Sequence, residues 1–269
     1  MSDPLDAHST DAGARLARYY DLDLLDDPGD LDLYLAMAER TGGPILELAG
    51  GSGRLAVPLA LAGHAVTVVD NDPHMLARAR DAWAAARPAG RRRTSGSLEL
   101  IEADLAGVSL GRRFGLAFIS LNSLLLLDGP DVQRQAMRVL AEHLRPGGVA
   151  IVDHVLPDAA DLGAYDGRLF LDWVREDPST GDLVTKLSSA RHDPATATVT
   201  MTTLFDTAPS GGGALQRTVR VDRLQLRNAT ELVRDATDAG LAIELLAGDH
   251  QGTPFGPGAE RIVLIAVSV

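Results

Sequence analysis

The sequence predicts an α/β fold, with a doubly wound sheet of seven strands and an antiparallel β insertion after the fifth strand. Two observations carry this prediction. From residue 45 to about 155, short apolar segments alternate with amphipathic ones, which is typical of parallel strands connected by covering helices. Beyond about residue 166, alternating segments are separated by turn residues, which indicates antiparallel pairing.

The elements of the main sheet follow in order along the chain. Two helices are expected within residues 12–41, on either side of a turn at Pro28 and Gly29. Gly147 and Gly148 fit a helix end before the fifth strand. The five strands are expected at 44–48, 65–70, 97–104, 116–120 and 149–155, and the helices between them include 73–86 and 130–144.

The second half of the chain holds the insertion and the return to the main sheet. A helix over 228–240 is capped by Asn228 or Thr230. The insertion strands are expected at 168–177, 182–193, 198–206 and 215–226, and two last strands at 242–249 and 261–269. The predicted domains are an N-terminal helical cap (1–43), a main domain (44–160 and 228–269) and the insertion (161–227).

Composition and charge narrow the class of protein. Hydrophobic residues make up 45% of the 269 residues, which suits a globular protein with a sizeable core. No apolar run approaches the roughly 20 residues that span a bilayer, and the first residues lack the order of a signal peptide. We therefore expect a cytoplasmic protein with no membrane partner.

The net charge of −12 disfavours nucleic acid as a partner. The one basic run, Arg91–Arg93, is expected in a solvated surface loop. The absence of cysteine excludes disulfides, thiolate nucleophiles and cysteine metal ligands. No metal site is predicted.

A glycine loop after the first strand indicates a nucleotide-like ligand. Residues 51–56, "GSGRLA", satisfy the dinucleotide pattern, and Asp70 lies near the expected distance for a ribose contact. Glu47 argues against a dinucleotide, because its carboxylate would oppose a pyrophosphate at the loop. S-adenosylmethionine has no phosphate and brings a sulfonium and an ammonium group, which a carboxylate attracts. The residues therefore favour S-adenosylmethionine over NAD.

Three further segments agree with that ligand. Asp70 can accept hydrogen bonds from both ribose hydroxyls, because a carboxylate offers only acceptors. Asn71 and Met75 are placed to border the adenine, and Asp104 to accept from the adenine amino group. All of them follow the carboxyl ends of strands, where open α/β sheets bind ligands.

These motifs resemble those of the class I S-adenosylmethionine-dependent methyltransferases, a family with a Rossmann-like fold, over essentially the whole chain. "ELAGGSGR" resembles the first motif, "VVDNDPHMLARAR" the ribose and adenine segment, "EADL" the adenine-amino segment, and "FISLNSLLLL" and "HLRPGGVAIVDHV" the fourth and fifth strands. "YYDLDLL", the insertion and the ending "GDHQGTPFGPGAERIVLIA" are similar to a small-molecule branch with N-methyltransferases of glycine and amino sugars. Ala49 departs from the first motif, which often has glycine there.

The resemblance implies a set of cofactor residues. It places at least one of Tyr19 and Tyr20 over the methionine end of the cofactor, where a π face favours a sulfonium. Both tyrosines could instead be helix core, and Arg54 could reach the cofactor carboxylate or solvent. The predicted cofactor-binding residues are Tyr20, Glu47, Gly51, Gly53, Arg54, Asp70, Asn71, Met75, Ala103, Asp104, Leu105 and Leu121.

The predicted acceptor side is less specific. Tyr19, Asn122, Trp173 and His250 are candidate substrate contacts, although Trp173 could be insertion core and Asn122 a loop hydrogen-bonder. His154 is the candidate general base, because histidine titrates near neutral pH. Strand alternation lets only one of Asp153 and His154 point well toward the ligand, and a structural histidine is the alternative.

The predicted function is methyl transfer from S-adenosylmethionine to a small molecule, with N-methylation of an amine in specialised metabolism ahead of O- or C-methylation. The leaving group is already activated, so the enzyme mainly orients the reactants and removes water. A binding protein that retains the cofactor without methylating is the alternative from another class. The insertion is expected to roof the acceptor site or to pair subunits, and we predict a homodimer.

Overall fold

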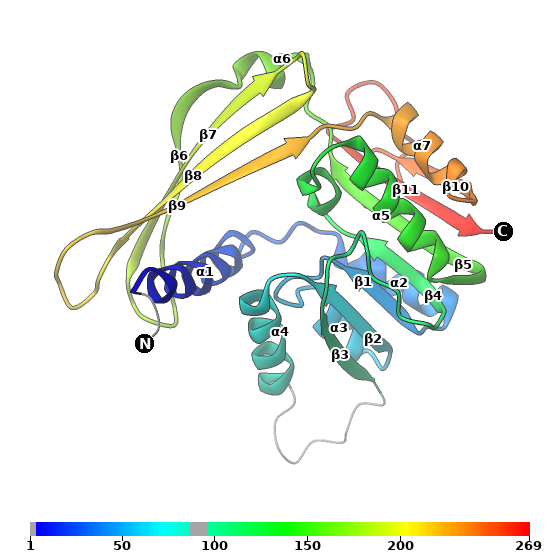
Figure 1. The fold of residues 1–269 in the computed structure, drawn as a ribbon, viewed down its shortest axis with the longest axis horizontal. Coiled ribbons are helices and arrows are strands. Elements are labelled where there is room, and N and C mark those ends of the chain that lie inside the picture. The colour runs from blue at the N-terminus through cyan, green and yellow to red at the C-terminus, as the bar shows by residue number, and fades with distance from the viewer. Residues whose placement is uncertain (1–3, 87–95) are drawn as a thin grey trace. The chain divides into compact units, whose positions relative to one another are not determined.

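The computed structural model of the chain describes residues 4–86 and 96–269, with side chains from residue 12 onward (Figure 1). The chain divides into two compact units. The larger unit comprises residues 28–158 and 227–269, and the smaller unit comprises residues 1–27 and 159–226. The predicted loop around Arg91–Arg93 lies outside the described residues.

The larger unit is built on a seven-stranded sheet, which confirms the predicted fold class. Its strand order is β10-β11-β5-β4-β1-β2-β3. Strands β1 to β5 pair in parallel, whereas β11 runs antiparallel to both β5 and β10. The strands are β1 (Ile45–Leu48), β2 (Ala65–Asp70), β3 (Ser97–Glu102), β4 (Phe114–Ile119), β5 (Leu144–Val155), β10 (Leu241–Ala247) and β11 (Arg261–Ser268).

Helices cover both faces of this sheet. On one face α2 (Leu31–Thr41), α3 (Ala56–Leu61) and α4 (Pro73–Ala85) bury side chains against the strands, and on the other α5 (Pro130–Glu142) and α7 (Ala229–Asp238) do so. The central strands β1 and β4 are buried along their whole length, because both of their faces are covered. Their near-continuous apolar sequence is what such a position requires.

The carboxyl ends of the parallel strands define one edge of the sheet, which we call the carboxyl edge. The loop between β10 and β11 reaches the same edge, because the antiparallel strand β11 begins at Arg261 opposite Val155, the last residue of β5. Side chains at the end of β5 and in the β10–β11 loop therefore lie close together, although about a hundred residues separate them in sequence.

The smaller unit packs one helix on an antiparallel sheet. Helix α1 (Pro4–Asp23) covers one face of the sheet through a small core of Tyr19, Leu22, Val184 and Phe205. The order β6-β7-β8-β9 follows the chain, as in consecutive hairpins. The strands are β6 (Asp166–Glu176), β7 (Leu183–Asp193), β8 (Thr198–Ala208) and β9 (Gln216–Gln225), preceded by α6 (Ala159–Ala164).

Several elements differ from the sequence expectation. The two N-terminal helices fall into different units, with α1 in the smaller and α2 in the larger one. Strand β5 starts at Leu144 rather than at residue 149, with a register irregularity against β4. The short helices η1 (Ser123–Leu126) and α6 were not predicted, since each is only one or two turns long. Within the described residues, no helix is long and apolar enough to cross a membrane.

Asn228 should stabilise the larger unit by capping α7. Its side chain accepts from the backbone N–H of Glu231, and the Glu231 side chain accepts from that of Asn228, which completes a capping box. We expect Asn228→Ala to lower the free energy of unfolding by about 1 kcal/mol in urea titrations. Thr230→Ala, on the exposed first turn of the same helix, is the matched control and should change it by less than about 0.5 kcal/mol. Equal effects of the two variants would contradict the capping role.

Candidate active site at the carboxyl edge

The glycine loop after β1 is held in left-handed backbone conformations. The φ angles of Ala49, Gly51 and Gly53 are 57°, 56° and 82°. A Cβ at Gly53 would lie 3.1 Å from side-chain atoms of both Val57 and Ala79, so glycine is needed there for space as well as conformation. Ala49, the departure from the family motif, adopts a conformation that costs a non-glycine residue about 1 kcal/mol. The loop therefore stores strain where the cofactor is predicted to bind.

Glu47 lies beneath this loop with half of its carboxyl group unpaired. The side chain leaves β1 toward α3, is 2% exposed, and accepts a hydrogen bond from the backbone N–H of Ala56. Its Oε2 atom is buried and has no hydrogen-bond partner among the described residues. Burial raises the pKa of Glu47 to about 8, against the opposing charge of Arg54. A buried, unpaired oxygen of this kind suits a positively charged ligand group at the loop.

Arg54 is fixed beside Glu47 by a second buried acid. Its guanidinium donates two hydrogen bonds, of 2.5 and 2.7 Å, to the carboxylate of Asp30, which is completely buried at the start of α2. This bidentate pair places a positive charge within reach of Glu47. The pairing accounts for the orientation of Arg54 without a ligand, so the predicted contact with the cofactor carboxylate stays a prediction.

Asp70 ends β2 and braces the same loop. Its Oδ2 accepts from the backbone N–H of Gly51 at 2.8 Å, and its Oδ1 accepts from that of Asp72 at 2.9 Å. Partial burial raises the pKa of Asp70, although these backbone bonds oppose the shift. Each carboxylate oxygen has a second lone pair, so Asp70 can still accept from ribose hydroxyls.

The other predicted adenine and loop residues follow the ends of β2 and β3, with Met75 in the first turn of α4. Asn71 and Asp104 are exposed, Met75 and Ala103 are half-buried, and Leu105 is buried. The Ala103 N–H donates to the Asp70 carbonyl, which ties the β3 end to the β2 end. The structure thus brings these predicted residues to one edge of the sheet, and their contacts with a cofactor stay predictions.

The end of β5 holds a carboxylate that sequence analysis weighed but did not select. Asp153 is completely buried and accepts hydrogen bonds from the hydroxyl of Tyr34, from Nε2 of His250 and from the Arg261 guanidinium. The backbone N–H of Leu121, in left-handed conformation after β4, donates to it as well. Burial alone would raise the pKa of Asp153, but the bond from His250 and the charge of Arg261 hold it below its ordinary value. Asp153 is therefore ionised at neutral pH.

The predicted base, His154, leaves β5 on the opposite face from Asp153. It pairs in register with Ile262 among the core residues that contact α5 and α7, and is completely buried. Its Nδ1 lies 2.8 Å from the Val155 carbonyl, so Nδ1 carries the proton and Nε2 the lone pair. That Nε2 is buried without a partner in the described part of the chain, and burial lowers the pKa of His154. The catalytic role of His154 stays a prediction that would require Nε2 to become accessible.

Asn122 and His250 are the two predicted acceptor residues of the larger unit. The Asn122 side-chain oxygen accepts from the Val155 N–H at 2.9 Å, which ties the loop after β4 to the end of β5. The His250 side chain is only 6% exposed and lies against Asp153, with Nε2 3.1 Å from Oδ2. Both residues are thus at the carboxyl edge, and neither substrate contact is tested by this geometry.

Asp30, Asp153 and His250 form the group in the described residues whose ligand atoms, all within 4.8 Å of one another, could hold a metal ion. Each carboxylate is already paired, Asp30 with Arg54 and Asp153 with Arg261. The two guanidinium charges balance the two carboxylates, so a cation would gain no net attraction there. The chemistry of this donor set does not fit a resident metal.

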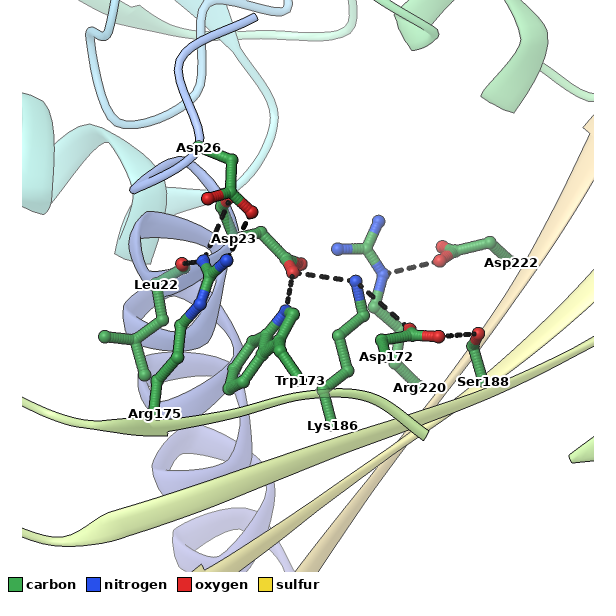
Figure 2. Close-up of polar contacts among 10 residues, drawn as sticks. All are labelled: Leu22, Asp23, Asp26, Asp172, Trp173, Arg175, Lys186, Ser188, Arg220 and Asp222. Carbon is green, nitrogen blue, oxygen red and sulfur yellow. Dashed lines mark hydrogen bonds and ion pairs between the residues drawn. The ribbon is translucent and has the colours of Figure 1, made fainter. Parts of the chain in front are cut away.

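Two predicted substrate contacts of the smaller unit, Tyr19 and Trp173, make internal contacts, and Figure 2 shows those of Trp173. Tyr19 is completely buried, stacks on Phe205 and has its hydroxyl 2.7 Å from that of Thr207. The Trp173 indole N–H donates to Asp23, and Arg175 lies over its ring. Both are core residues of this unit, and their substrate contacts stay predictions. Tyr20, one residue along α1, is half-buried.

Figure 2 also shows a row of charged pairs beside Trp173 on this face of the sheet. Lys186, the single lysine of the sequence, lies between Asp23 at 2.7 Å and Asp172 at 3.7 Å. Arg220 pairs with Asp222 at 2.7 Å farther along the sheet. The face therefore offers both signs of charge next to an aromatic ring.

Sequence reasoning missed three members of the carboxyl-edge network, Asp30, Tyr34 and Arg261. Asp30 is typical of a helix start and Tyr34 of a helix core, so neither carried a functional signal. Arg261 opens a strand that is otherwise apolar. Arg261 lies opposite Val155, the last residue of β5, and Asp153 precedes Val155 by two residues on that strand. This placement was the one signal that could have indicated a buried partner for Arg261.

The raised pKa of Glu47 should make stability depend on pH. The folded state binds this proton more tightly than the unfolded state, so stability falls as pH rises from the ordinary carboxyl pKa of 4.5 to about 8. We expect the ligand-free protein to lose about 2 kcal/mol of unfolding free energy between pH 6 and 8 through this group, and Glu47→Gln to abolish that loss. Urea titrations at the two pH values measure it, with Glu102→Gln, an exposed carboxyl on β3, as control. Parallel curves for wild type and Glu47→Gln would contradict the assignment.

Comparisons with known proteins agree with this geometry. A family model described as a methyltransferase domain matches residues 45–148. The cypemycin N-terminal methyltransferase of a Streptomyces species is 27% identical over 131 residues, which are 47% of this chain and 48% of that protein. The chain therefore aligns with about half the length of this curated relative.

Solved structures cover more of the chain. The CcbJ methyltransferase from Streptomyces caelestis is 25% identical with a TM-score of 0.71, over 91% of this chain and 98% of that one. An S-adenosylmethionine-dependent methyltransferase from Clostridium acetobutylicum ATCC 824 shares the fold at 18% identity, with a TM-score of 0.77 over 94% and 98%. Over residues 45–148 the chain is therefore similar to a methyltransferase domain, and the chain shares the fold of solved S-adenosylmethionine-dependent methyltransferases.

Proposed function

We propose that the protein transfers a methyl group from S-adenosylmethionine to the nitrogen of an amine on a small metabolite. The observation that carries the proposal is the buried, unpaired Oε2 of Glu47 beneath the glycine loop. A ligand with ammonium and sulfonium groups would stabilise the ionised form of this carboxyl, whereas a phosphate-bearing ligand would keep it protonated and gain no ion pair there.

The residues of the larger unit have distinct tasks in this proposal. The backbone of Gly51 and Gly53 allows close approach of the ligand, Asp70 accepts from the ribose, and Asp104 from the adenine amino group. Bound S-adenosylmethionine supplies a methyl group on a positively charged sulfur, which makes the leaving group good without protein assistance. The protein then has to orient the acceptor, exclude water and hold the acceptor nitrogen in its neutral form.

Nitrogen is favoured over oxygen or carbon as the acceptor atom for a chemical reason. A neutral amine attacks with its own lone pair, whereas a hydroxyl or carbon acid needs a strong, well-placed base. The name of the cypemycin relative specifies an N-terminal methyltransferase, which also supports an amine. O- or C-methylation is the alternative within the class, and cofactor binding without methylation is the alternative outside it.

The test is turnover of S-adenosylmethionine to S-adenosylhomocysteine with a panel of small amines and matched alcohols and phenols. We expect turnover with at least one amine and a product mass increased by one methyl group. Asp70→Asn should weaken S-adenosylhomocysteine binding about tenfold or more, because a ribose hydroxyl loses a charged acceptor. Asp81→Asn, on the exposed side of α4, should bind like wild type. Turnover with phenols alone would replace N- by O-methylation, and binding without turnover would leave a cofactor-binding protein.

We also propose that the protein is a homodimer that pairs through the smaller unit. The face of its sheet opposite α1 carries an apolar row across all four strands, formed by Leu171, Leu187, Leu204 and Val219. Leu171 is 61% and Val219 51% exposed, and Val221 beside them is 63% exposed. Contiguous apolar surface of this kind usually marks an interface.

Light scattering should give the dimer mass for wild type at micromolar concentration. Val219→Asp should shift the mass toward the monomer, because it places an unpaired charge in the apolar row. Gln216→Asp is the matched control, since residue 216 is exposed on the same strand but on the other face, and it should stay dimeric. A wild-type monomer mass across this concentration range would rule out the dimer.

A further inference from the structure

Two histidines near the end of β5 differ in which ring nitrogen is open. In His154 the nitrogen with the lone pair, Nε2, is sealed in the core. In His250 the Nε2 atom lies 3.1 Å from a carboxylate oxygen of Asp153 and must donate to it, because an ionised carboxylate only accepts. In the neutral ring, Nδ1 of His250 therefore carries the lone pair. It makes no hydrogen bond with any described residue and is not among the sealed atoms.

We infer that His250, oriented by Asp153, takes the proton from the acceptor amine. The inference rests on the proposed function and names a different residue for the role that sequence analysis gave to His154. Asp153 acts as the positioning residue, because its bond to Nε2 fixes both the ring orientation and the tautomer that leaves Nδ1 basic.

The surroundings of His250 suit this role. Asp153, from β5, stays ionised because it is saturated with donors, and its negative charge stabilises the imidazolium that proton uptake creates. The other charged and titratable groups around the pair are Asp30 and Tyr34 from the α2 side and Arg261 from β11. A carboxylate oxygen of Asp30 lies within 4.8 Å of a His250 ring nitrogen and adds to the stabilisation. Arg261 opposes it, but its guanidinium is engaged by Asp153.

The reaction balances with one proton and one methyl group. The acceptor arrives as an ammonium ion, and its proton passes to Nδ1 of His250, which leaves a neutral amine and an imidazolium. The amine lone pair forms the bond to the methyl carbon, and the bond from that carbon to sulfur breaks with its electron pair on sulfur. The products are a methylated ammonium ion and a neutral thioether, and the imidazolium returns its proton to solvent.

The decisive measurement is kcat/KM against pH, with an α-amine acceptor whose ordinary pKa is about 8. We expect His250→Gln to lower kcat/KM about tenfold at pH 7, where only about a tenth of the amine is neutral in solution, and less than threefold at pH 9, where the amine arrives neutral without help. S-adenosylhomocysteine affinity should stay within twofold of wild type. His64→Gln, the same change at the start of β2 and so at the other edge of the sheet, is the matched control and should follow wild type at both pH values.

Three results would overturn the inference. They are a wild-type profile for His250→Gln, an equal loss at both pH values together with weaker S-adenosylhomocysteine binding, or the pH-dependent loss in His154→Gln instead. Each of these leaves methyl transfer to an amine intact. The absence of wild-type turnover with every amine would instead remove the proposed function.

A second readout tests the histidine without an acceptor. Nitrogen-15 NMR of the ligand-free wild-type protein should show the neutral His250 ring protonated at Nε2 and bare at Nδ1. In Asp153→Asn, both tautomers of His250 should be populated. A neutral wild-type His250 that is protonated at Nδ1 and bare at Nε2 would overturn the inference whatever the activity. Because the tautomer is measured in the unmodified chain, a folding defect in Asp153→Asn would leave this test decisive.

Discussion

The carboxyl edge of the larger unit depends on one buried carboxylate, that of Asp153. An isolated ionised carboxylate in a protein core is strongly unfavourable, and it persists only when donors saturate it. Here the donors come from four different places: α2 through Tyr34, the loop after β4 through the Leu121 N–H, the β10–β11 loop through His250, and β11 through Arg261. The one carboxylate therefore connects four segments that are far apart in sequence. Removing it would leave all four donors without this acceptor.

A second buried acid, Glu47, lies two strands away in the sheet and, unlike Asp153, is not saturated with hydrogen-bond donors. Asp153 is ionised and saturated, whereas Glu47 has a raised pKa near 8 and an oxygen with no partner in the described residues. The difference follows from the donors available, since Glu47 has one backbone N–H and the nearby charge of Arg54, which is itself held by Asp30. The two acids thus differ in how far donors saturate them, although both lie on strands of the same sheet.

The sheet could be predicted from the sequence because its signals are local. Alternation of apolar and amphipathic segments, glycine after β1 and turn residues in the insertion each act within a few residues. The network at the edge could not be predicted in the same way, because its pairs are distant in sequence, as with Arg54 and Asp30 or Arg261 and Asp153. Strand alternation correctly separated Asp153 from His154, but it carries no information on which face is sealed. That required the positions of α5, α7 and the β10–β11 loop, which are set by tertiary packing.

The two units also have separate cores. The larger unit contains the glycine loop, both buried acids and both histidines, and its core is tied to these residues through α2, β5 and β11. The smaller unit has its own core of Tyr19, Leu22, Val184 and Phe205, and it needs no residue of the carboxyl edge to hold its sheet together. Substitutions on the faces of that sheet, including the charged pairs around Lys186 and the apolar row at Leu187, therefore leave the acids and the histidine tautomers unchanged. The fold alone therefore does not fix which acceptor or partner the protein uses.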